Sequence, residues 1–362
     1  MPAARAHSPH SPTHAARPFG LAIVGAGLAA APHLAALLEL RERIAVHHVV
    51  GRSSTRAEAL AGRLPHADTG TDLDRALSDP RVDGVLLLTP PDTHLTLGSR
   101  IAAAGRHLLV EKPVELTVQR ARELLQVCES HGVVAATVLQ HRARPAATRL
   151  AQLLRDEALG PLHGASIMVP WWRPQSYYDE PGRGTLARDG GGVLMTQAIH
   201  TLDLYVWLTG MPQQVFARAL TSSAHRMECE DTVAGVLMHG GGRVASLFAS
   251  TAAPPGFPDR IELYGPRGSA LLSAGRLELR LADGTRLDTG DAEAVGSGAD
   301  PMAFSHHAHR AILANFADAA HGRATPIAPM RDAIGVQSLI EALIASSRSG
   351  ASQLIESETR RG

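Results

Sequence analysis

The stretch LAIVGAGLAA, residues 21–30, decides the fold. A short apolar run ends in Gly25 and Gly27, and the small residue Ala30 follows, which gives the pattern GxGxxA. The first glycine permits a tight turn, the second lets the backbone approach a pyrophosphate, and the small third residue lets helix and strand pack closely. The N-terminus of the helix would face the anion. We therefore predict a dinucleotide site that includes Gly25, Gly27, Leu28 and Ala30, with a purely structural turn as the alternative.

The same residues lie inside a longer apolar run, Phe19–Leu40. Such a run is also typical of a secretory signal or a membrane span. The two glycines, Pro32 and His33 interrupt it and argue against that interpretation. We expect a cytoplasmic protein without a membrane partner, and we expect residues 1–17, which are rich in Pro, Ala and His, to be a disordered leader.

The first 140 residues alternate between strand and helix patterns. Strands are predicted at 21–24, 45–50, 84–89, 107–110 and 133–139, and helices at 28–40, 55–64, 93–104 and 117–130. The second of these helices is predicted to open with a capping box from Thr55 to Glu58. Alternating βαβ units of this length predict an α/β fold in which residues 18–140 form a Rossmann domain with a doubly wound parallel sheet.

The pattern changes in residues 141–362. Short alternating strands separated by glycine turns predict a mostly antiparallel sheet, so this second domain is expected to be α+β. Its helices are predicted at 145–156, 193–208, 307–321 and 332–347, and residues 289–300 are predicted to form a surface loop.

Composition excludes some functions. The 362 residues include 35 Lys+Arg and 35 Asp+Glu, so no basic surplus is present to neutralise phosphates, and a nucleic-acid partner is disfavoured. Cys128 and Cys229 are isolated, which predicts no disulfide. His306, His307 and His309 open a helix without carboxylates at the spacing of metal ligands, so we expect no metal.

The end of the second predicted strand indicates which cofactor binds. An acidic residue about 20 positions after the glycines normally binds the ribose 2′-hydroxyl. Here Gly51, Arg52 and Ser53 follow the strand instead. An arginine beside hydroxyls suits a 2′-phosphate, so we favour NADP over NAD. The alternative is that Arg52 stacks on adenine or is solvated.

Two segments carry candidate catalytic groups. Glu111 and Lys112 follow a strand at the edge where doubly wound sheets bind ligands, and Lys112 could donate to a reacting oxygen. The alternative for Lys112 is a surface ion pair with Glu111. In the second domain, Thr196, His200 and Asp203 are spaced to share one helix face, and His200 could accept a proton while hydride leaves the same carbon.

Two further features belong to this second segment. The glycines at 190–192 would let a ligand approach the helix, and Gln197 could hold another hydroxyl. The alternative for His200 is a buried histidine satisfied by Asp203.

The stretch 171–179, WWRPQSYYD, concentrates two of the three Trp and two of the four Tyr. Aromatic rings with interleaved arginines suit stacking on sugars and binding of hydroxyls or phosphates. Substrate-binding candidates here are Arg173, Tyr177, Tyr178 and Arg183. A loop packed on the sheet, or a subunit interface, is the alternative.

Together these motifs make the chain resemble the Gfo/Idh/MocA oxidoreductases, the glucose-fructose oxidoreductase and inositol dehydrogenase family, from about Leu21 onward. The matching stretches are GAGLAA (25–30), TPPDTH (89–94), EKP (111–113), QHRARP (140–145), GGG to IHTLD (190–203) and NFADAAHGRATP (315–326). The stretch from 171 to 203 looks most like the branch that acts on nucleotide-linked or N-acetylated sugars and their uronic acids.

The resemblance implies a site between the two domains. It implies NAD or NADP as cofactor, an active-site turn at Lys112-Pro113 that is often cis, and a C-terminal sheet used to form homo-oligomers. Many members carry aspartate where this chain has Thr196, which puts in doubt any carboxylate orienting His200 from that side. The resemblance adds as cofactor-binding residues Ser53, Thr89, Pro90, His94 and Glu111, and as catalytic residues Lys112, His200 and Asp203.

The predicted function is an NAD(P)-dependent dehydrogenase of a sugar, sugar acid, nucleotide-sugar or cyclitol. His200 would accept the hydroxyl proton, with Asp203 or solvent setting its state, and Lys112 would stabilise the alkoxide. Substrate contacts are expected from Thr196 and Gln197 as well. Two alternatives stand: a non-catalytic nucleotide-sensing regulator, and a glycosidase that uses transient oxidation by bound NAD.

Overall fold

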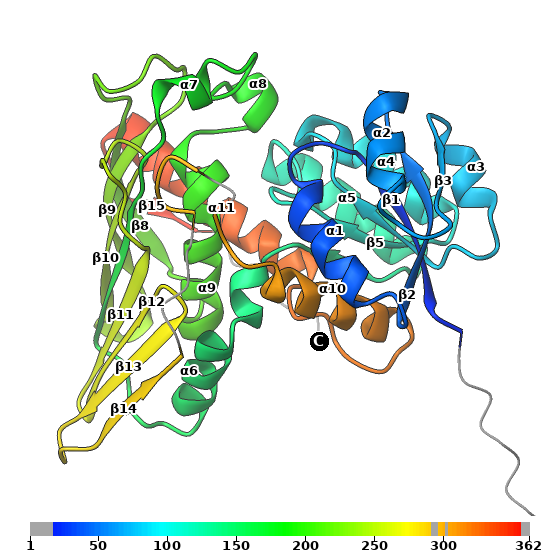
Figure 1. Ribbon diagram of the computed structural model, residues 1–362. Coiled ribbons are helices and arrows are strands. Elements are labelled where there is room, and N and C mark those ends of the chain that lie inside the picture. Colours follow the sequence, from blue (N-terminus) through cyan, green and yellow to red (C-terminus); the bar gives the residue numbers. More distant parts are fainter. Residues whose placement is uncertain (1–16, 291–295, 301–302, 356–362) are drawn as a thin grey trace, which may run out of the picture.

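The N-terminal half is built on a parallel sheet of six strands (Figure 1). The computed structural model describes residues 17–290, 296–300 and 303–355. The strands are β1 (Phe19–Val24), β2 (Ile44–Val50), β3 (Asp68–Gly70), β4 (Gly84–Leu87), β5 (His107–Val110) and β6 (Ala135–Thr137). Their order, β3-β2-β1-β4-β5-β6, is that of a dinucleotide-binding Rossmann domain, which confirms the predicted fold class.

Helices cover both faces of this sheet, as expected for a doubly wound fold. They are α1 (Ala30–Glu39), α2 (Ser54–Ala61), α3 (Leu73–Ser78), α4 (His94–Ala103) and α5 (Val118–Ser130). β3 and α3 were not predicted, because the strand is three residues long and its apolar pattern is too short to detect. The predicted capping box was wrong: Ser53, not Thr55, has extended backbone and caps α2 by accepting from the Arg56 amide.

The second sheet has nine strands in the order β14-β13-β12-β11-β7-β10-β9-β8-β15. Neighbouring strands are antiparallel except β7 and β10, so the prediction of a mostly antiparallel sheet is confirmed. The strands are β7 (Gly164–Pro170), β8 (Gln214–Leu220), β9 (Thr232–Met238), β10 (Val244–Ser250), β11 (Arg260–Gly265), β12 (Gly268–Ser273), β13 (Arg276–Leu281), β14 (Arg286–Thr289) and β15 (Gln353–Leu354).

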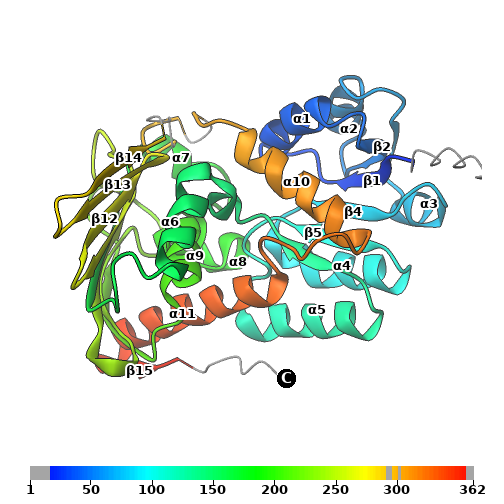
Figure 2. The same cartoon turned by 90° about the horizontal axis from the view of Figure 1, so that it is seen from below.

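Helices line the face of the second sheet that points toward the Rossmann domain (Figure 2). They are α6 (Pro145–Arg155), α9 (Ile199–Thr209) and α11 (Met330–Ser349). The remaining helices of this part of the chain are α7 (Gln175–Tyr178), α8 (Leu186–Asp189) and α10 (His307–Ala320). No described helix is long and apolar enough to cross a membrane. On the outer face, Phe216, Val236 and Val244 are exposed.

The last two helices join the domains. α10 packs on α1, and Phe316 meets Phe19 of β1 edge to face with ring centroids 5.6 Å apart. α11 packs on β8 and α9 of the second domain and also on α5. The core of the first domain therefore includes residues far beyond position 140.

The helix predicted at 193–208 is not regular. Leu194–Ala198 form a π-helical turn, and α9 begins only at Ile199. A π-turn holds more residues than an α-turn, so the argument that placed Thr196, His200 and Asp203 on one face does not apply across it. Such turns are frequent at functional sites.

Candidate active site

The glycine turn after β1 has the properties that a dinucleotide site requires. Gly25 has φ +107°, and a Cβ there would lie 2.8 Å from the Leu88 main chain, so both conformation and packing demand glycine. A Cβ on Gly27 would meet nothing within 4 Å. Packing within the protein therefore does not explain Gly27, and the open space suits a bound phosphate at the N-terminus of α1. Leu28 is exposed beside this space, and Ala30 is buried against the sheet.

The tip of β2 presents cationic groups. Arg52 and Arg56 are exposed and, among the described residues, make no side-chain hydrogen bond or ion pair. The Ser53 hydroxyl accepts from the Arg56 amide at 3.5 Å, a long contact that leaves its own proton for another acceptor. The residues present at this tip therefore fit a phosphate.

His94 has a different role from the one expected. Its ring is buried, with Nδ1 3.0 Å from the Val114 carbonyl and Nε2 2.8 Å from the Thr89 carbonyl. It ties the turn after β4, which carries half-buried Thr89 and exposed Pro90, to the turn after β5. Both ring nitrogens face protein carbonyls, so His94 shapes the cofactor-binding edge rather than facing it.

The turn after β5 is held by the buried side chain of Gln337. Gln337 of α11 accepts from the Val114 amide at 3.0 Å and donates to the Glu115 carbonyl at 2.8 Å. The bond between Lys112 and Pro113 is cis, as the resemblance implied. The backbone that carries Lys112 is thereby fixed at the carboxyl end of the sheet.

The Lys112 side chain reaches the second domain. Its Nζ donates to the main-chain carbonyl of Thr196, in the π-turn, at 2.6 Å. The Glu111 carboxylate instead binds His33 Nε2 at 2.8 Å and the Lys112 amide at 3.0 Å, so a Glu111–Lys112 side-chain pair is not formed. Burial lowers the pKa of Lys112, against the pull of Glu111.

His200 lies buried beside this lysine. Burial lowers its pKa well below the ordinary value, and the nearby charge of Lys112 adds to the effect, so the ring is neutral at neutral pH. Its Nδ1 is buried and has no hydrogen-bond partner among the residues that the structure describes. The ring of His141 stacks on it with centroids 5.0 Å apart. His141 was missed as a site residue, although the motif QHRARP contained it.

Asp203 does not set the state of His200 in this structure. Its two oxygens accept from Arg142, with Nε at 2.9 Å and Nη2 at 2.6 Å. Arg142 also binds Asp332 at 2.7 Å. Asp203 forms a buried ion pair instead of a contact with His200, because the π-turn and α9 direct it toward the segment after β6, and its catalytic role stays a prediction.

Thr196 and Gln197 begin a polar network on the substrate side. The Thr196 hydroxyl donates to the Gly192 carbonyl at 2.7 Å and contacts the Gln197 side-chain oxygen, and it does not reach His200. The Gln197 amide donates to the Tyr177 hydroxyl at 3.3 Å. Arg183 donates to the same hydroxyl at 2.9 Å and lies 4.3 Å above the Tyr177 ring. The structure thus brings together these substrate-binding candidates from two separate segments, and their role in binding substrate stays a prediction.

Arg173 and Tyr178 were assigned to substrate but bind protein. Arg173 is buried and donates to the carbonyls of Trp172 at 2.8 Å and Gly296 at 2.7 Å. The Tyr178 hydroxyl shares a 2.7 Å hydrogen bond with Thr251. Both side chains therefore hold the loop above the site, which is the alternative that the sequence left open.

The glycines at 190–192 serve packing rather than ligand approach. A Cβ on Gly192 would lie 1.8 Å from the Glu230 carbonyl, and Gly190 has φ +74° against the Leu116 backbone. The Glu230 carboxylate accepts from the amides of Gly192 and Leu194, both at 3.2 Å, and so caps this helix start. No local signal in the sequence pointed to Glu230.

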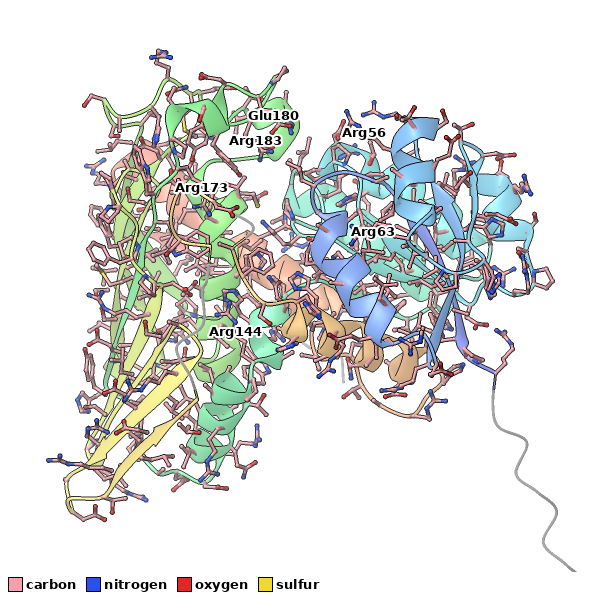
Figure 3. The ribbon with its side chains drawn as sticks, viewed as in Figure 1. Arg56, Arg63, Arg144, Arg173, Glu180 and Arg183 are labelled. Carbon is pink, nitrogen blue, oxygen red and sulfur yellow. The ribbon has the colours of Figure 1, made fainter. Side chains whose placement is uncertain are left out.

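Arg183 is a charged group of the second domain on the side that faces the Rossmann domain (Figure 3). In this view Arg183 and Glu180 lie on the side of the second domain that faces Arg56 of α2. Arg183 binds Glu180 at 2.5 Å with its side chain 16% exposed. A partly open guanidinium beside Tyr177 is able to contact an anionic or hydroxylated substrate.

Comparison with known proteins agrees with this geometry. Residues 19–139 match the model "Oxidoreductase family, NAD-binding Rossmann fold", and residues 147–271 match the model of the GFO/IDH/MocA C-terminal domain. The chain is similar to the rhizopine catabolism protein MocA of Rhizobium meliloti, 28% identical over 342 residues, which are 90% of this chain and 93% of that protein.

Two further proteins extend the comparison. D-apiose dehydrogenase of Paraburkholderia graminis is 27% identical over 349 residues, 92% of this chain and 88% of that protein. The WlbA dehydrogenase of Chromobacterium violaceum, solved with NADH and UDP-GlcNAcA, is 25% identical with a TM-score of 0.83, over 97% of this chain and 99% of that one.

Proposed function

The chain belongs to the Gfo/Idh/MocA family of NAD(P)-dependent oxidoreductases, and on that premise we propose that it transfers hydride between the nicotinamide and a CH–OH carbon of a carbohydrate. We favour nucleotide-linked or N-acetylated sugars and their uronic acids. The WlbA structure, solved with a UDP-linked uronic acid, and the partly open guanidinium of Arg183 beside Tyr177 support this class.

One observation carries the proposal. Lys112, on a turn of the Rossmann domain, donates at 2.6 Å to the π-turn that leads directly to His200. A cationic donor and a neutral imidazole thereby meet where the two domains face each other. A proton acceptor beside a hydrogen-bond donor is what oxidation of a hydroxyl requires.

We assign the steps as follows. The nicotinamide supplies the hydride acceptor when it is bound. His200 accepts the proton of the substrate hydroxyl, and the Lys112 ammonium donates to the same oxygen as negative charge develops there. Gln197, Tyr177 and Arg183 position the remaining hydroxyl or acidic groups of the substrate. His94 and Gln337 keep the Lys112 turn in place.

A direct assay tests this function. Purified protein is incubated with NAD or NADP and a panel of sugars, uronates and nucleotide-sugars, and the absorbance of the reduced cofactor is followed. We expect turnover with a member of the nucleotide-sugar or uronate group. A regulator would bind cofactor without turnover, and a glycosidase using transient oxidation would cleave substrate without net change in added cofactor; either result would exclude the proposal.

We propose NADP as the preferred cofactor, and Arg52 tests it. Arg52→Ala should weaken NADP binding by about tenfold, the equivalent of about 1.4 kcal/mol, while NAD binding changes little, because NAD lacks the 2′-phosphate. The measurement is the dissociation constant of each cofactor for both proteins. Arg63→Ala, at an exposed arginine beyond the end of α2, is the matched control. Tenfold tighter NAD binding by the unaltered protein would contradict the assignment.

Loss of the Lys112 ammonium should slow the reaction. Lys112→Ala removes the donor to the developing alkoxide, and kcat should fall by about 10²–10³-fold, the cost of losing one such donor. Thr196→Ala should cost much less, because Lys112 binds the main-chain carbonyl of Thr196 rather than its side chain. Near-normal kcat in Lys112→Ala, or an equal loss in Thr196→Ala, would contradict the role of Lys112 as the main donor to the alkoxide.

We also propose that the protein is cytoplasmic and forms a homo-oligomer through the outer face of the second sheet. The exposed side chains of Phe216, Val236 and Val244 on three neighbouring strands support this interface. Light scattering of the purified chain measures its mass, and a monomer would exclude the interface.

A further inference from the structure

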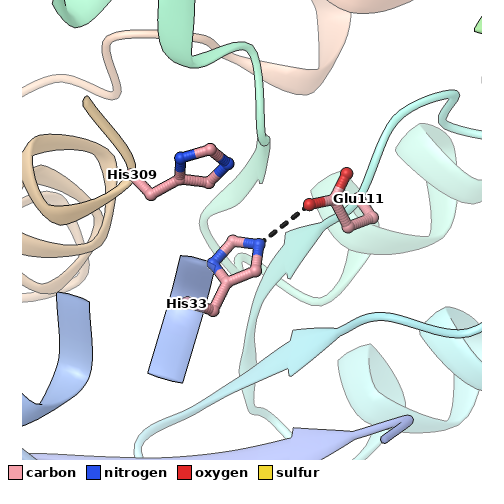
Figure 4. A group of neighbouring side chains, drawn as sticks. All are labelled: His33, Glu111 and His309. Atoms are coloured by element: carbon pink, nitrogen blue, oxygen red, sulfur yellow. Dashed lines mark hydrogen bonds and ion pairs between the residues drawn. The ribbon is translucent and has the colours of Figure 1, made fainter. Parts of the chain in front are cut away.

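Three ligand-type side chains meet where α1, the turn after β5 and α10 come together (Figure 4). They are His33, Glu111 and His309, and one ligand atom of each lies within 4.8 Å of the other two. The histidines are buried, at 1% and 3% exposure. Nothing in the hydride-transfer chemistry uses either ring.

One of the two rings lacks the partner that a buried imidazole normally has. His309 Nδ1 is buried without a hydrogen-bond partner, and the His309 ring makes no hydrogen bond to any described residue. Buried polar groups without partners are rare in native proteins, and a bound ion or water is one of the reasons for which they occur. Burial lowers the pKa of His309 to about 3, so this ring is neutral and offers a lone pair.

The other two members of the cluster, His33 and Glu111, are hydrogen-bonded to each other, and the proton of that bond lies where a metal ion would bind. His33 Nε2 and Glu111 Oε1 are 2.8 Å apart, a hydrogen bond in which the imidazole N–H donates to the carboxylate (Figure 4). Metal ions displace such protons when they bind. Phe304 stacks on His309 with ring centroids 5.6 Å apart and covers that side of the cluster.

We propose that His33, Glu111 and His309 bind a divalent transition-metal ion of the zinc class, with a water molecule as fourth ligand. Two imidazoles and one carboxylate form a donor set that zinc prefers. Tetrahedral zinc with bonds of about 2.0–2.1 Å needs ligand atoms about 3.3 Å apart. Binding an ion therefore requires the 2.8 Å contact to open slightly and requires any wider separation, none of which exceeds 4.8 Å, to close by at most about 1.5 Å.

The proposed site includes a carboxylate that the sequence spacing did not reveal. The sequence showed His306, His307 and His309 without carboxylates nearby, but α10 turns His309 inward to Glu111. The other two histidines face outward near Glu39, which binds His306 at 2.7 Å and Arg310 at 2.9 Å. That second cluster is exposed and holds a guanidinium, so it suits a cation poorly and provides a matched control.

An ion in the buried site would join α10 to the cofactor-binding helix α1 and to the turn of the catalytic lysine. The Lys112 ammonium binds the Thr196 carbonyl and is not one of the three proposed ligands. The ion would therefore stabilise the contact between the domains and fix Glu111 without entering the substrate site. This inference does not depend on the proposed substrate or cofactor.

The test uses the whole chain without cofactor. Protein treated with chelator is titrated with Zn²⁺, bound zinc is counted after gel filtration, and Co²⁺ serves as a spectroscopic probe of tetrahedral N/O ligation. We expect a single tightly bound equivalent and a higher Tm with zinc. Loss of a residue that only hydrogen-bonds a metal ligand weakens metal binding by about 10–100-fold. His33→Ala and His309→Ala each remove a ligand itself, so each should weaken zinc binding by more than that.

The controls make every outcome decisive. His306→Ala and His307→Ala should bind zinc as the unaltered protein does. If an alanine variant fails to fold, the isosteric Glu111→Gln must show the same loss of zinc. Absence of bound zinc in the unaltered protein, or equal binding by His33→Ala, would overturn the site, as would zinc lost in the His306 or His307 variant.

Discussion

Replacing His200 by alanine should lower kcat by about 10²–10⁴-fold, the usual contribution of a general base, with cofactor affinity little changed. The ring lies beside Lys112, is neutral because burial lowers its pKa, and has Nδ1 without a partner. The measurement is kcat and the cofactor dissociation constant on the substrate that the assay identifies. Near-normal turnover would place the base elsewhere, with Lys112 or Tyr177 next.

The pH profile of the unaltered protein gives a second readout. A pKa of His200 below its ordinary value places the acid limb of kcat/KM below about pH 6.5, since the ring must be neutral to accept a proton. Lys112 must keep its proton to donate, so activity should be lost as pH rises through its own lowered pKa, below 10.5. If the acid limb of the pH profile is the same in His200→Ala as in the unaltered protein, that limb does not report the protonation of His200.

Asp203→Ala should lower the free energy of unfolding by about 3–5 kcal/mol, because it leaves Arg142 buried without its main partner. Both residues are buried, and two hydrogen bonds of 2.9 and 2.6 Å join them. The chain region after β6 is thereby fastened to α9, next to His200. The measurement is the denaturant midpoint at constant pH.

The matched control is Asp332→Ala. Asp332 binds the same guanidinium at 2.7 Å, but its side chain is 45% exposed, so its loss should cost only about 0–1 kcal/mol. A small effect of Asp203→Ala on stability together with a large loss of kcat would restore the catalytic role that the sequence suggested.

The sequence by itself determined the parts of this protein that depend on local pattern. The alternation of strands and helices predicted the parallel sheet, and the glycine pattern from Gly25 to Ala30 predicted the cofactor turn. These features are encoded in periodicity and in conformations that few residues adopt, such as the positive φ of Gly25. The grouping of Gln197, Tyr177 and Arg183 on the substrate side could also be predicted from residue type.

Only the tertiary structure decided which side chains become partners. Asp203 binds Arg142, which is 61 positions away, and Glu111 binds His33, which is 78 positions away. The π-turn at 194–198 shifts the helix face that regular spacing predicted, and α10 returns from the end of the chain to place His309 beside Glu111. Such contacts depend on how distant segments pack, because the free energy of a buried polar group is set by the groups that surround it and not by its neighbours in sequence.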